Sequence, residues 1–164
     1  MKKIILFFII FTIQFPSLVS KEPKLEEILS GLKGPWSLSF IDNSRILVTE
    51  KQGNFFLADL KSKNLSKINH NLNILVDGQG GLLEVLYSND NVFVSYSENR
   101  GKGKSSTSVA RASFNNKELK FKNIFSAEPP INSGYHFGSR LVIKDNLLYI
   151  TAGERGEGMI AQDP

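Results

Sequence analysis

One short pattern, found three times, constrains the fold of this chain more than any other feature. In each copy an apolar run meets a turn of two to four residues rich in Asp and Asn, and a second apolar run then ends at a hydroxyl side chain. Two apolar runs around a short polar turn predict a β-hairpin. The hydroxyl residues of successive copies are 46 and 56 positions apart. The copies cover residues 38–50, 83–97 and 140–154.

The spacing of the copies indicates how the hairpins are arranged. It is close to the length of a four-stranded propeller blade, a small twisted sheet that must stack on its neighbours to bury both faces. After residue 20, no segment keeps a helical period of 3.6 residues over eleven positions. We therefore predict an all-β protein of the β-propeller class. A β-sandwich whose hairpins resemble one another by chance is the alternative.

The length of the chain is short for a closed ring of blades. Propellers close with about 4 to 8 blades of roughly 50 residues each. Residues 21–164 hold about three such units. We expect these residues to form the N-terminal part of a larger propeller, about its first three blades, truncated at the C-terminus.

Other segments are assigned from the same rules of pattern and turn chemistry. Residues 21–32 are charged and fit either a strand or a short helical turn. His70 lies in a polar stretch, 67–71, and is interpreted as an exposed loop residue. Residues 98–105 resemble a phosphate-binding loop but lack its first glycine, and we interpret them as a solvated hairpin loop. Further strands are expected at residues 36–41, 45–50, 55–60, 106–114 and 119–125.

The first twenty residues have the layout of a secretory signal peptide. Two lysines precede an apolar run, and Pro16 and small residues lead to a cleavage site near Ser20. An uncleaved N-terminal anchor is the alternative. Either way the body of the protein is expected to be exported, to the periplasm or outside the cell. After cleavage no stable membrane span is expected.

Composition excludes several classes of function. The chain has no cysteine, so disulfides, thiolate catalysis and cysteine-based metal sites are excluded. The formal charge of +4 falls to 4 − 2 = +2 once Lys2 and Lys3 are removed with the signal, which is too low to indicate nucleic-acid binding. The two histidines lack metal-ligand spacing, and no G-x-S-x-G motif for a serine nucleophile occurs.

The third hairpin carries the best candidate for chemistry. His136 stands just before its first strand and Glu154 just after its second. Both positions lie at the open end of a hairpin, so the two side chains are predicted to be neighbours despite the eighteen positions between them. An imidazole beside a carboxylate is a general base with an orienting partner. The alternative is a histidine that only hydrogen-bonds locally.

A glycine-rich loop supplies a second candidate. Residues 76–83 enter the second hairpin, and Gln79 stands at the apex of the loop. Glycines let the backbone approach a ligand closely, and the amide of Gln79 offers both a donor and an acceptor. A tight turn without any binding role is the alternative.

Five linked motifs resemble those of the glucose/sorbosone dehydrogenase family. They are GLKGPWSLSFIDNSRILVTEKQGNFFLAD, DGQGGLLEV, FVSYSE, SVARASF and YHFGSRLVIKDNLLYITAGERGEGMIAQD, in order over nearly all of residues 31–163. The resemblance implies a six-bladed β-propeller and an exported aldose dehydrogenase that uses pyrroloquinoline quinone (PQQ) and calcium. It names neither the sugar nor the electron acceptor.

The resemblance also implies roles for four residues. His136 matches the catalytic histidine that takes the proton of the anomeric hydroxyl, and Glu154 stands where the family usually has an aspartate that holds this histidine. Gln79 matches a glutamine beside substrate and cofactor. Tyr135 replaces a substrate-binding aspartate of glucose dehydrogenases, which favours a broader aldose substrate range or another substrate. The calcium ligands and most PQQ contacts are expected beyond this chain.

Two other functions remain open at this point. Tyr135 and Glu154 depart from the family pattern and favour a non-enzymatic exported propeller, a binding or scaffold protein. A lactonase-type propeller with a metal in its central channel would need converging Glu, Asn and Asp ligands, which the sequence does not identify.

Overall fold

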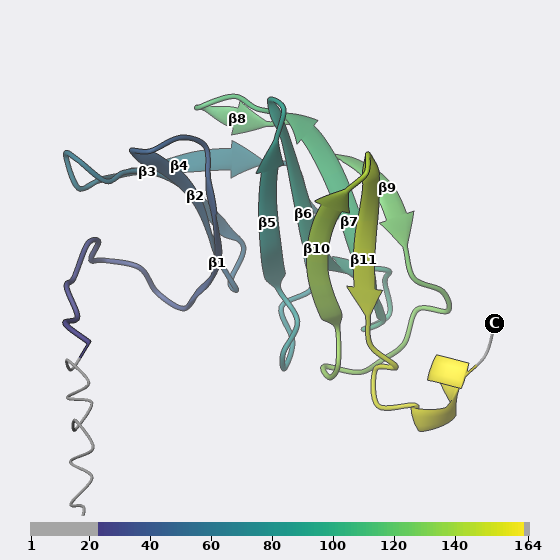
Figure 1. Cartoon of the computed structure of the whole chain (residues 1–164). Helices are drawn as coiled ribbons and strands as arrows, with labels where there is room; N and C mark the ends of the chain where they lie inside the picture. The colour runs from purple at the N-terminus through teal and green to yellow at the C-terminus, as the bar shows by residue number, and fades with distance from the viewer. Residues whose placement is uncertain (1–22, 163–164) are drawn as a thin grey trace, which may run out of the picture.

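The computed structural model describes residues 23–162, and this part of the chain is built almost wholly from β-strands (Figure 1). The prediction of an all-β fold is confirmed. No helix in this part is long and apolar enough to cross a membrane. A short 3₁₀ helix, η1 (Gly158–Gln162), follows the last strand. The strands are β1 (Pro35–Phe40), β2 (Arg45–Glu50), β3 (Asn54–Asp59), β4 (Asn64–His70), β5 (Leu82–Ser88), β6 (Asn91–Asn99), β7 (Ser105–Ser113), β8 (Glu118–Leu119), β9 (Lys122–Ser126), β10 (Gly138–Lys144) and β11 (Leu147–Ala152).

The strands form three sheets that follow one another along the chain. The first has the order β1-β2-β3-β4-β8, the second β5-β6-β7-β9, and the third is the pair β10-β11. Neighbouring strands within a sheet pair antiparallel, as the short turns between successive strands require. The exception is β8, which returns from the second sheet and pairs in parallel with β4 of the first. This return strand ties two sheets together.

Each predicted hairpin opens one of these sheets. The hairpins are β1-β2, β5-β6 and β10-β11, and in each the register shifts near the open end. Such a shift is a β-bulge, which bends the strand and increases its twist. In the first two repeats the hydroxyl that ends the repeat connects neighbouring sheets, whereas that of Thr151 accepts the backbone N–H of Arg140 within its own hairpin. Thr49 Oγ1 donates to the carbonyl of Leu83 (2.6 Å), and Ser95 Oγ donates to the carbonyl of Ser139 (2.6 Å).

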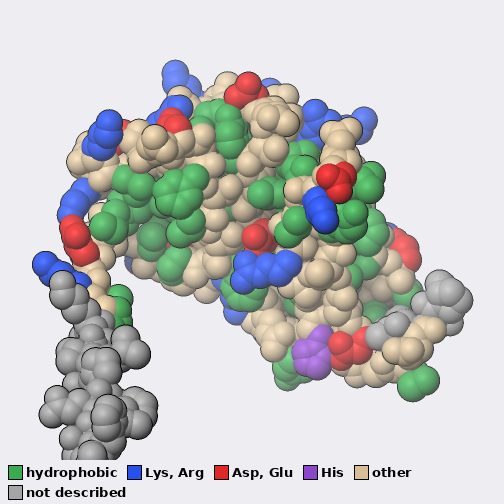
Figure 2. All heavy atoms as spheres, viewed as in Figure 1, with side chains coloured by type: hydrophobic (Ala, Val, Ile, Leu, Met, Phe, Trp, Pro, Cys, Tyr) green, Lys and Arg blue, Asp and Glu red, His purple; other side chains and the backbone are tan. Residues whose placement is uncertain are grey.

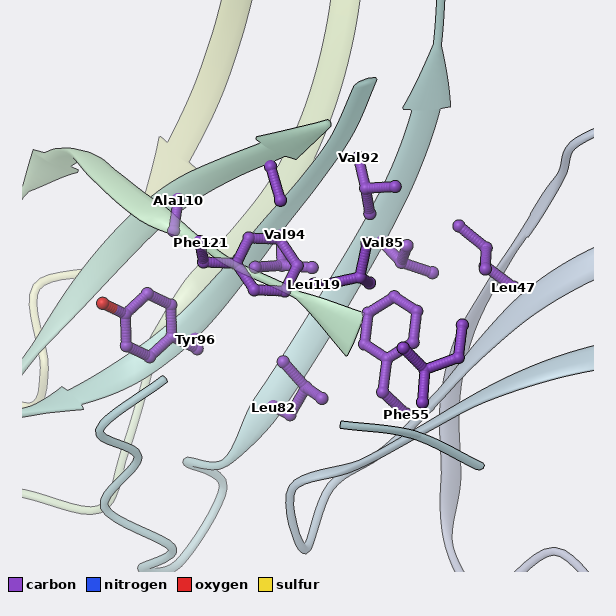
Figure 3. Packing of buried hydrophobic residues seen from close by; sticks show 12 residues of the cluster. Leu47, Phe55, Leu82, Val85, Val92, Val94, Tyr96, Ala110, Leu119 and Phe121 are labelled. Carbon is purple, nitrogen blue, oxygen red and sulfur yellow. The ribbon is translucent and has the colours of Figure 1, made fainter. Parts of the chain in front are cut away.

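The main core lies between the first and second sheets (Figure 3). Phe55 of β3 is fully buried and packs against Phe121, with ring centroids 6.2 Å apart. Because alternate residues of a strand face opposite sides, the remaining apolar residues of the first sheet form a second, smaller cluster on its other face. Leu29 and Leu32 pack on that cluster. Of residues 21–32, left open between strand and helix, the described part, 23–32, forms neither, and its Leu29 and Leu32 cover part of this cluster.

Two sequence predictions need correction. Residues 67–70 belong to β4 and not to a loop. The ring of His70 stands edge-on to those of Phe55 and Phe121, and its Nε2 is bonded to the carbonyl of Gly53 (2.8 Å). The strand was missed because most of its side chains face solvent and are polar. The single strand expected at residues 119–125 is divided into β8 and β9, which belong to different sheets.

The described residues do not close into a ring. The sheets stack in chain order (Figure 1), and large apolar side chains stay exposed on the outer faces of the first and third, although Leu29 and Leu32 cover part of the first. Phe40 on the first is 59% exposed, and Tyr149 on the third is 51% exposed. Open apolar faces of this kind are expected for a stack of sheets that continues in a larger protein.

Candidate active site

The open end of the β10-β11 hairpin brings the predicted pair together. Gly138 pairs with Ala152 at that end, so the residues just outside both strands meet. Nδ1 of His136 is hydrogen-bonded to Oε1 of Glu154. The prediction that these two side chains are neighbours is confirmed. The imidazole is 52% exposed and the carboxylate 25% exposed, so the pair is accessible from solvent.

Backbone geometry at two positions makes this contact. His136 has a φ of 50°, a left-handed conformation that turns the chain sharply before β10. Gly153 lies against it, and a Cβ at residue 153 would overlap the carbonyl of His136. Only glycine permits this approach. This close approach of the two backbones places the side chain of Glu154 within reach of the imidazole.

The hydrogen bonds assign a role to each ring nitrogen. Oε1 of Glu154 also accepts from the backbone N–H of Gly156 (3.2 Å). The bond from His136 is the main cause that lowers the pKa of Glu154 from its ordinary value of 4.5, so this group is a carboxylate at neutral pH. A carboxylate accepts, so Nδ1 carries the hydrogen and Nε2 keeps its lone pair. This tautomer can accept a proton at Nε2. Figure 2 shows a histidine side chain at the surface beside an acidic one.

The glycine-rich loop meets the same turn. Gln79 Oε1 accepts the backbone N–H of His136 (2.9 Å), and the backbone N–H of Gln79 donates to the carbonyl of Gly134 (2.7 Å). Gly78 has a φ of 51°, and a Cβ there would lie 2.5 Å from the Gly134 oxygen. The loop is therefore shaped to hold the histidine turn. Gln79 fixes the backbone of His136, a contact that the sequence did not predict.

Tyr135 completes the set of predicted residues. Its side chain is 60% exposed, and its ring stands edge-on to the imidazole with centroids 6.2 Å apart. All four residues singled out from the sequence thus lie within one surface region. Their roles in binding and catalysis stay predictions.

Sequence reasoning missed Arg155, which lies behind this turn and is only 5% exposed. An arginine in a polar loop is usually solvated, so the residue type gave no signal. Lys51, also missed, donates from its ammonium to the carbonyl of Gly78. Both cations contact backbone carbonyls of the loops around His136.

These contacts bear on the cofactors that the resemblance implies. PQQ carries three carboxylates, which proteins bind with arginine and lysine. Here Arg155 is buried and Lys51 is bonded to a carbonyl. Within residues 23–162 no group of three or more His, Asp or Glu side chains could hold a metal ion. The described part of the site therefore supplies a general base, while its two nearby cations are bonded to backbone carbonyls and it presents no group of three or more carboxylate or imidazole ligands for calcium.

Comparisons with known proteins agree with the fold and the motifs. The chain is 30% identical over 149 residues to the aldose sugar dehydrogenase YliI of Escherichia coli (strain K12), which covers 85% of this chain and 40% of that protein. A solved glucose dehydrogenase superposes with a TM-score of 0.80 at 33% identity, covering 85% of this chain and 47% of that one. The PQQ-bound aldose sugar dehydrogenase of Streptomyces coelicolor superposes with a TM-score of 0.72 at 21% identity, covering 85% and 43%. The last comparison supports the fold alone.

The chain spans less than half the length of each of these relatives. Its sheets match those of the solved dehydrogenases, so the fold is that of the propeller family. The model of the glucose/sorbosone dehydrogenase family matches residues 32–164, which is most of the chain. This protein therefore belongs to the glucose/sorbosone dehydrogenase family.

Proposed function

We propose that this chain is the N-terminal part of an exported, PQQ-dependent aldose sugar dehydrogenase with a six-bladed propeller fold. The observation that carries the proposal is the bond between His136 and Glu154, made at the position of the catalytic histidine in the family motif. Residues 1–20, the proposed signal peptide, lie outside the described residues. The periplasm is the proposed location.

The proposed reaction removes two hydrogens from the sugar. The anomeric O–H loses a proton and C1 loses a hydride, which converts the aldose to a lactone. Nε2 of His136 takes the proton, and the carboxylate of Glu154 stabilises the imidazolium that results. The quinone, when bound, supplies the redox chemistry by accepting the hydride. A positioned base of this kind contributes roughly 10²- to 10⁴-fold to the rate.

Substrate contacts are proposed for Tyr135 and Gln79. The exposed ring of Tyr135 beside the imidazole offers an apolar surface with a hydroxyl. It carries no charge to select a particular sugar hydroxyl, which favours a broad range of aldoses. Gln79 binds the histidine backbone through its oxygen, which leaves its amide nitrogen as the donor for a ligand.

The rest of the cofactor site would come from the part of the relatives that this chain does not span. No group of three or more His, Asp or Glu side chains among residues 23–162 could hold a metal ion, and this chain spans less than half the length of the relatives. We therefore expect no PQQ-dependent sugar oxidation from the 164-residue chain alone. Measurable oxidation by the chain with PQQ and calcium would overturn this part of the proposal.

A hybrid enzyme tests the proposal directly. Residues 31–163 replace the aligned segment of the Escherichia coli aldose sugar dehydrogenase, and the hybrid is assayed with PQQ, calcium and a panel of aldoses. The expected result is sugar oxidation that falls by about 10²- to 10⁴-fold in His136→Asn. The matched control is His70→Asn, which alters the other histidine of the chain and should leave the catalytic step unchanged.

The same assay distinguishes the enzyme from the alternative of a binding or scaffold protein. Glu154 does reach His136, so one of the two departures from the family pattern no longer favours a decayed site. A hybrid that folds and binds PQQ, yet oxidises no aldose and does not differ from His136→Asn, would refute the enzyme and favour a binding or scaffold protein.

A further inference from the structure

Arg155 is a buried charge that forms no ion pair with any carboxylate of residues 23–162. Burial lowers the pKa of Arg155, and the charge of Asp77 opposes that shift. Burying a guanidinium is costly unless its donors are satisfied, so the groups that satisfy them indicate what the residue does.

The groups that accept hydrogen bonds from Arg155 belong to two segments of the chain. Nε donates to the carbonyl of Tyr135 (2.9 Å), and Nη2 donates to the carbonyl of Ser133. On the other side, Nη1 donates to the carbonyl of Ser105 (3.0 Å) and Nη2 to its hydroxyl (2.9 Å). Ser105 begins β7 of the second sheet. One planar group thus ties the turn that carries His136 to a strand of the neighbouring sheet.

The residue after the histidine is held as well. Cζ of Arg155 lies 3.6 Å from the ring centroid of Phe137, a cation–π contact. The guanidinium therefore contacts residues on both sides of His136 in the chain. Thr107 Oγ1 adds a bond to the carbonyl of Phe137 (2.8 Å). The histidine itself, with its left-handed φ, is the residue that this clamp encloses.

Position in the sequence links the clamp to the general base. Arg155 directly follows Glu154, whose carboxylate holds the imidazole. Adjacent residues therefore hold the ring and the backbone of the same histidine. A movement of residues 133–137 away from Arg155 would also move the imidazole away from Glu154. Lysine could not replace this function, because a single ammonium lacks the fork of donors that reaches several carbonyls at once.

We propose that Arg155 is a positioning residue, whose guanidinium clamps residues 133–137 against β7 so that the imidazole of His136 stays bonded to Glu154. The contribution of Arg155 to catalysis rests on the proposed function. Its positioning of His136 does not rest on that function, since it concerns contacts within this chain. A spectroscopic test can therefore be separated from enzymatic activity.

The two histidines of the chain provide the readout and its internal reference. His136 should be the Nδ1–H tautomer, because Nδ1 donates to a carboxylate. His70 should be the Nε2–H tautomer, because its Nδ1 accepts the N–H of Leu72 (3.3 Å) and its Nε2 donates to Gly53. Long-range ¹H–¹⁵N spectra of the ¹⁵N-labelled chain distinguish the two tautomers.

The variants are Arg155→Gln and Arg155→Lys, with Arg140→Lys as the matched control. Arg140 lies on the same hairpin, is exposed and pairs with Glu84, outside the proposed machinery. We expect both Arg155 variants to lose the Nδ1–H signature of His136, while the spectrum of His70 stays unchanged. Arg140→Lys should leave both histidines as in the parent chain.

Three outcomes overturn the proposal: a folded Arg155→Gln or Arg155→Lys that keeps the parent His136 spectrum, equal changes at both histidines, or the same change in Arg140→Lys. If Arg155→Gln does not fold, Arg155→Lys decides, because it keeps the charge and the aliphatic stem. In an active hybrid, Arg155→Lys should lower kcat by about tenfold or more, with KM for the aldose little changed. A hybrid without activity would refute the proposed function, and the spectra would still decide the role of Arg155.

Discussion

Replacement of Phe55 by alanine should reveal how strongly the first two sheets depend on each other. The phenyl ring is fully buried in the cluster that the two sheets share (Figure 3). It contacts Phe121, which follows the return strand β8 in the chain. A buried phenylalanine removes roughly 150–250 Å² from water, worth about 4–6 kcal/mol at about 25 cal/mol per Å². Measured Phe→Ala changes in cores cost about 3–5 kcal/mol, and this is the loss of unfolding free energy that we expect.

Phe40→Ala is the matched control, since it deletes the same ring from the open face of the same sheet. Phe40 is 59% exposed, so most of its ring gains nothing from folding. Its removal should cost about 1 kcal/mol or less. The difference between the two variants measures the shared core and not the loss of aromatic side chains in general.

Urea unfolding of the purified chain, followed by two probes, provides the measurement. The single tryptophan, Trp36, lies on β1 and reports on the first sheet, while far-ultraviolet circular dichroism reports on all strands. A shared core requires coincident transitions. The reasoning is refuted if Phe55→Ala costs under about 1 kcal/mol, or no more than Phe40→Ala.

Three further predictions concern the bonds around the site. Ser95→Ala should lower the unfolding free energy in urea by about 2 kcal/mol, because a buried carbonyl and the N–H of Glu84 (3.1 Å) lose their hydrogen-bond partner. The equivalent change at an exposed position, Thr151→Ala, should lower it by less than about 1 kcal/mol. Gly153→Ala should force Glu154 and His136 apart, seen as loss of the Nδ1–H signature of His136; an unchanged spectrum would contradict the close contact. The pKa of Glu154 is lower in the folded state than in the unfolded state. The stabilisation from its bond to His136 is therefore complete above about pH 4.5 and is lost as the pH falls through the folded-state pKa. A ¹³C titration of that carboxyl should show a midpoint below 4.5, which returns toward 4.5 in His136→Asn.

The hairpins and the His136–Glu154 pair could be predicted because both follow from local rules. Alternating apolar runs around Asp/Asn turns specify a hairpin without reference to the rest of the chain. Once a hairpin exists, the residues beyond its two strands must lie together. The structure confirms this geometry at the third repeat, where Gly138 pairs with Ala152.

The remaining features depend on contacts between distant segments. Most side chains of β4 are polar and exposed, so its sequence resembles a loop. Only in the folded chain does Ile68 enter the shared core and His70 pack against Phe55 and Phe121, and His70 was misread for this reason. β8 exists only because the chain returns to the first sheet, which no local pattern encodes. Arg155 is buried by the carbonyls of Ser105 and Tyr135, which are 50 and 20 positions away. A local pattern could not identify those partners.

The candidate site belongs to no single sheet, and this has a consequence for how stability and chemistry are linked. The base precedes β10 and its carboxylate follows β11, but the bond to the backbone N–H of His136 comes from Gln79, just before β5. Thr107 and Ser105 of β7 hold the same turn from behind, directly or through Arg155. The second sheet and the loop before it thus fix the backbone, and the loops that flank the third sheet supply the reacting side chains. Any change that loosens one sheet from the other, even at the distant Ser95, should therefore disturb the imidazole before it unfolds either sheet.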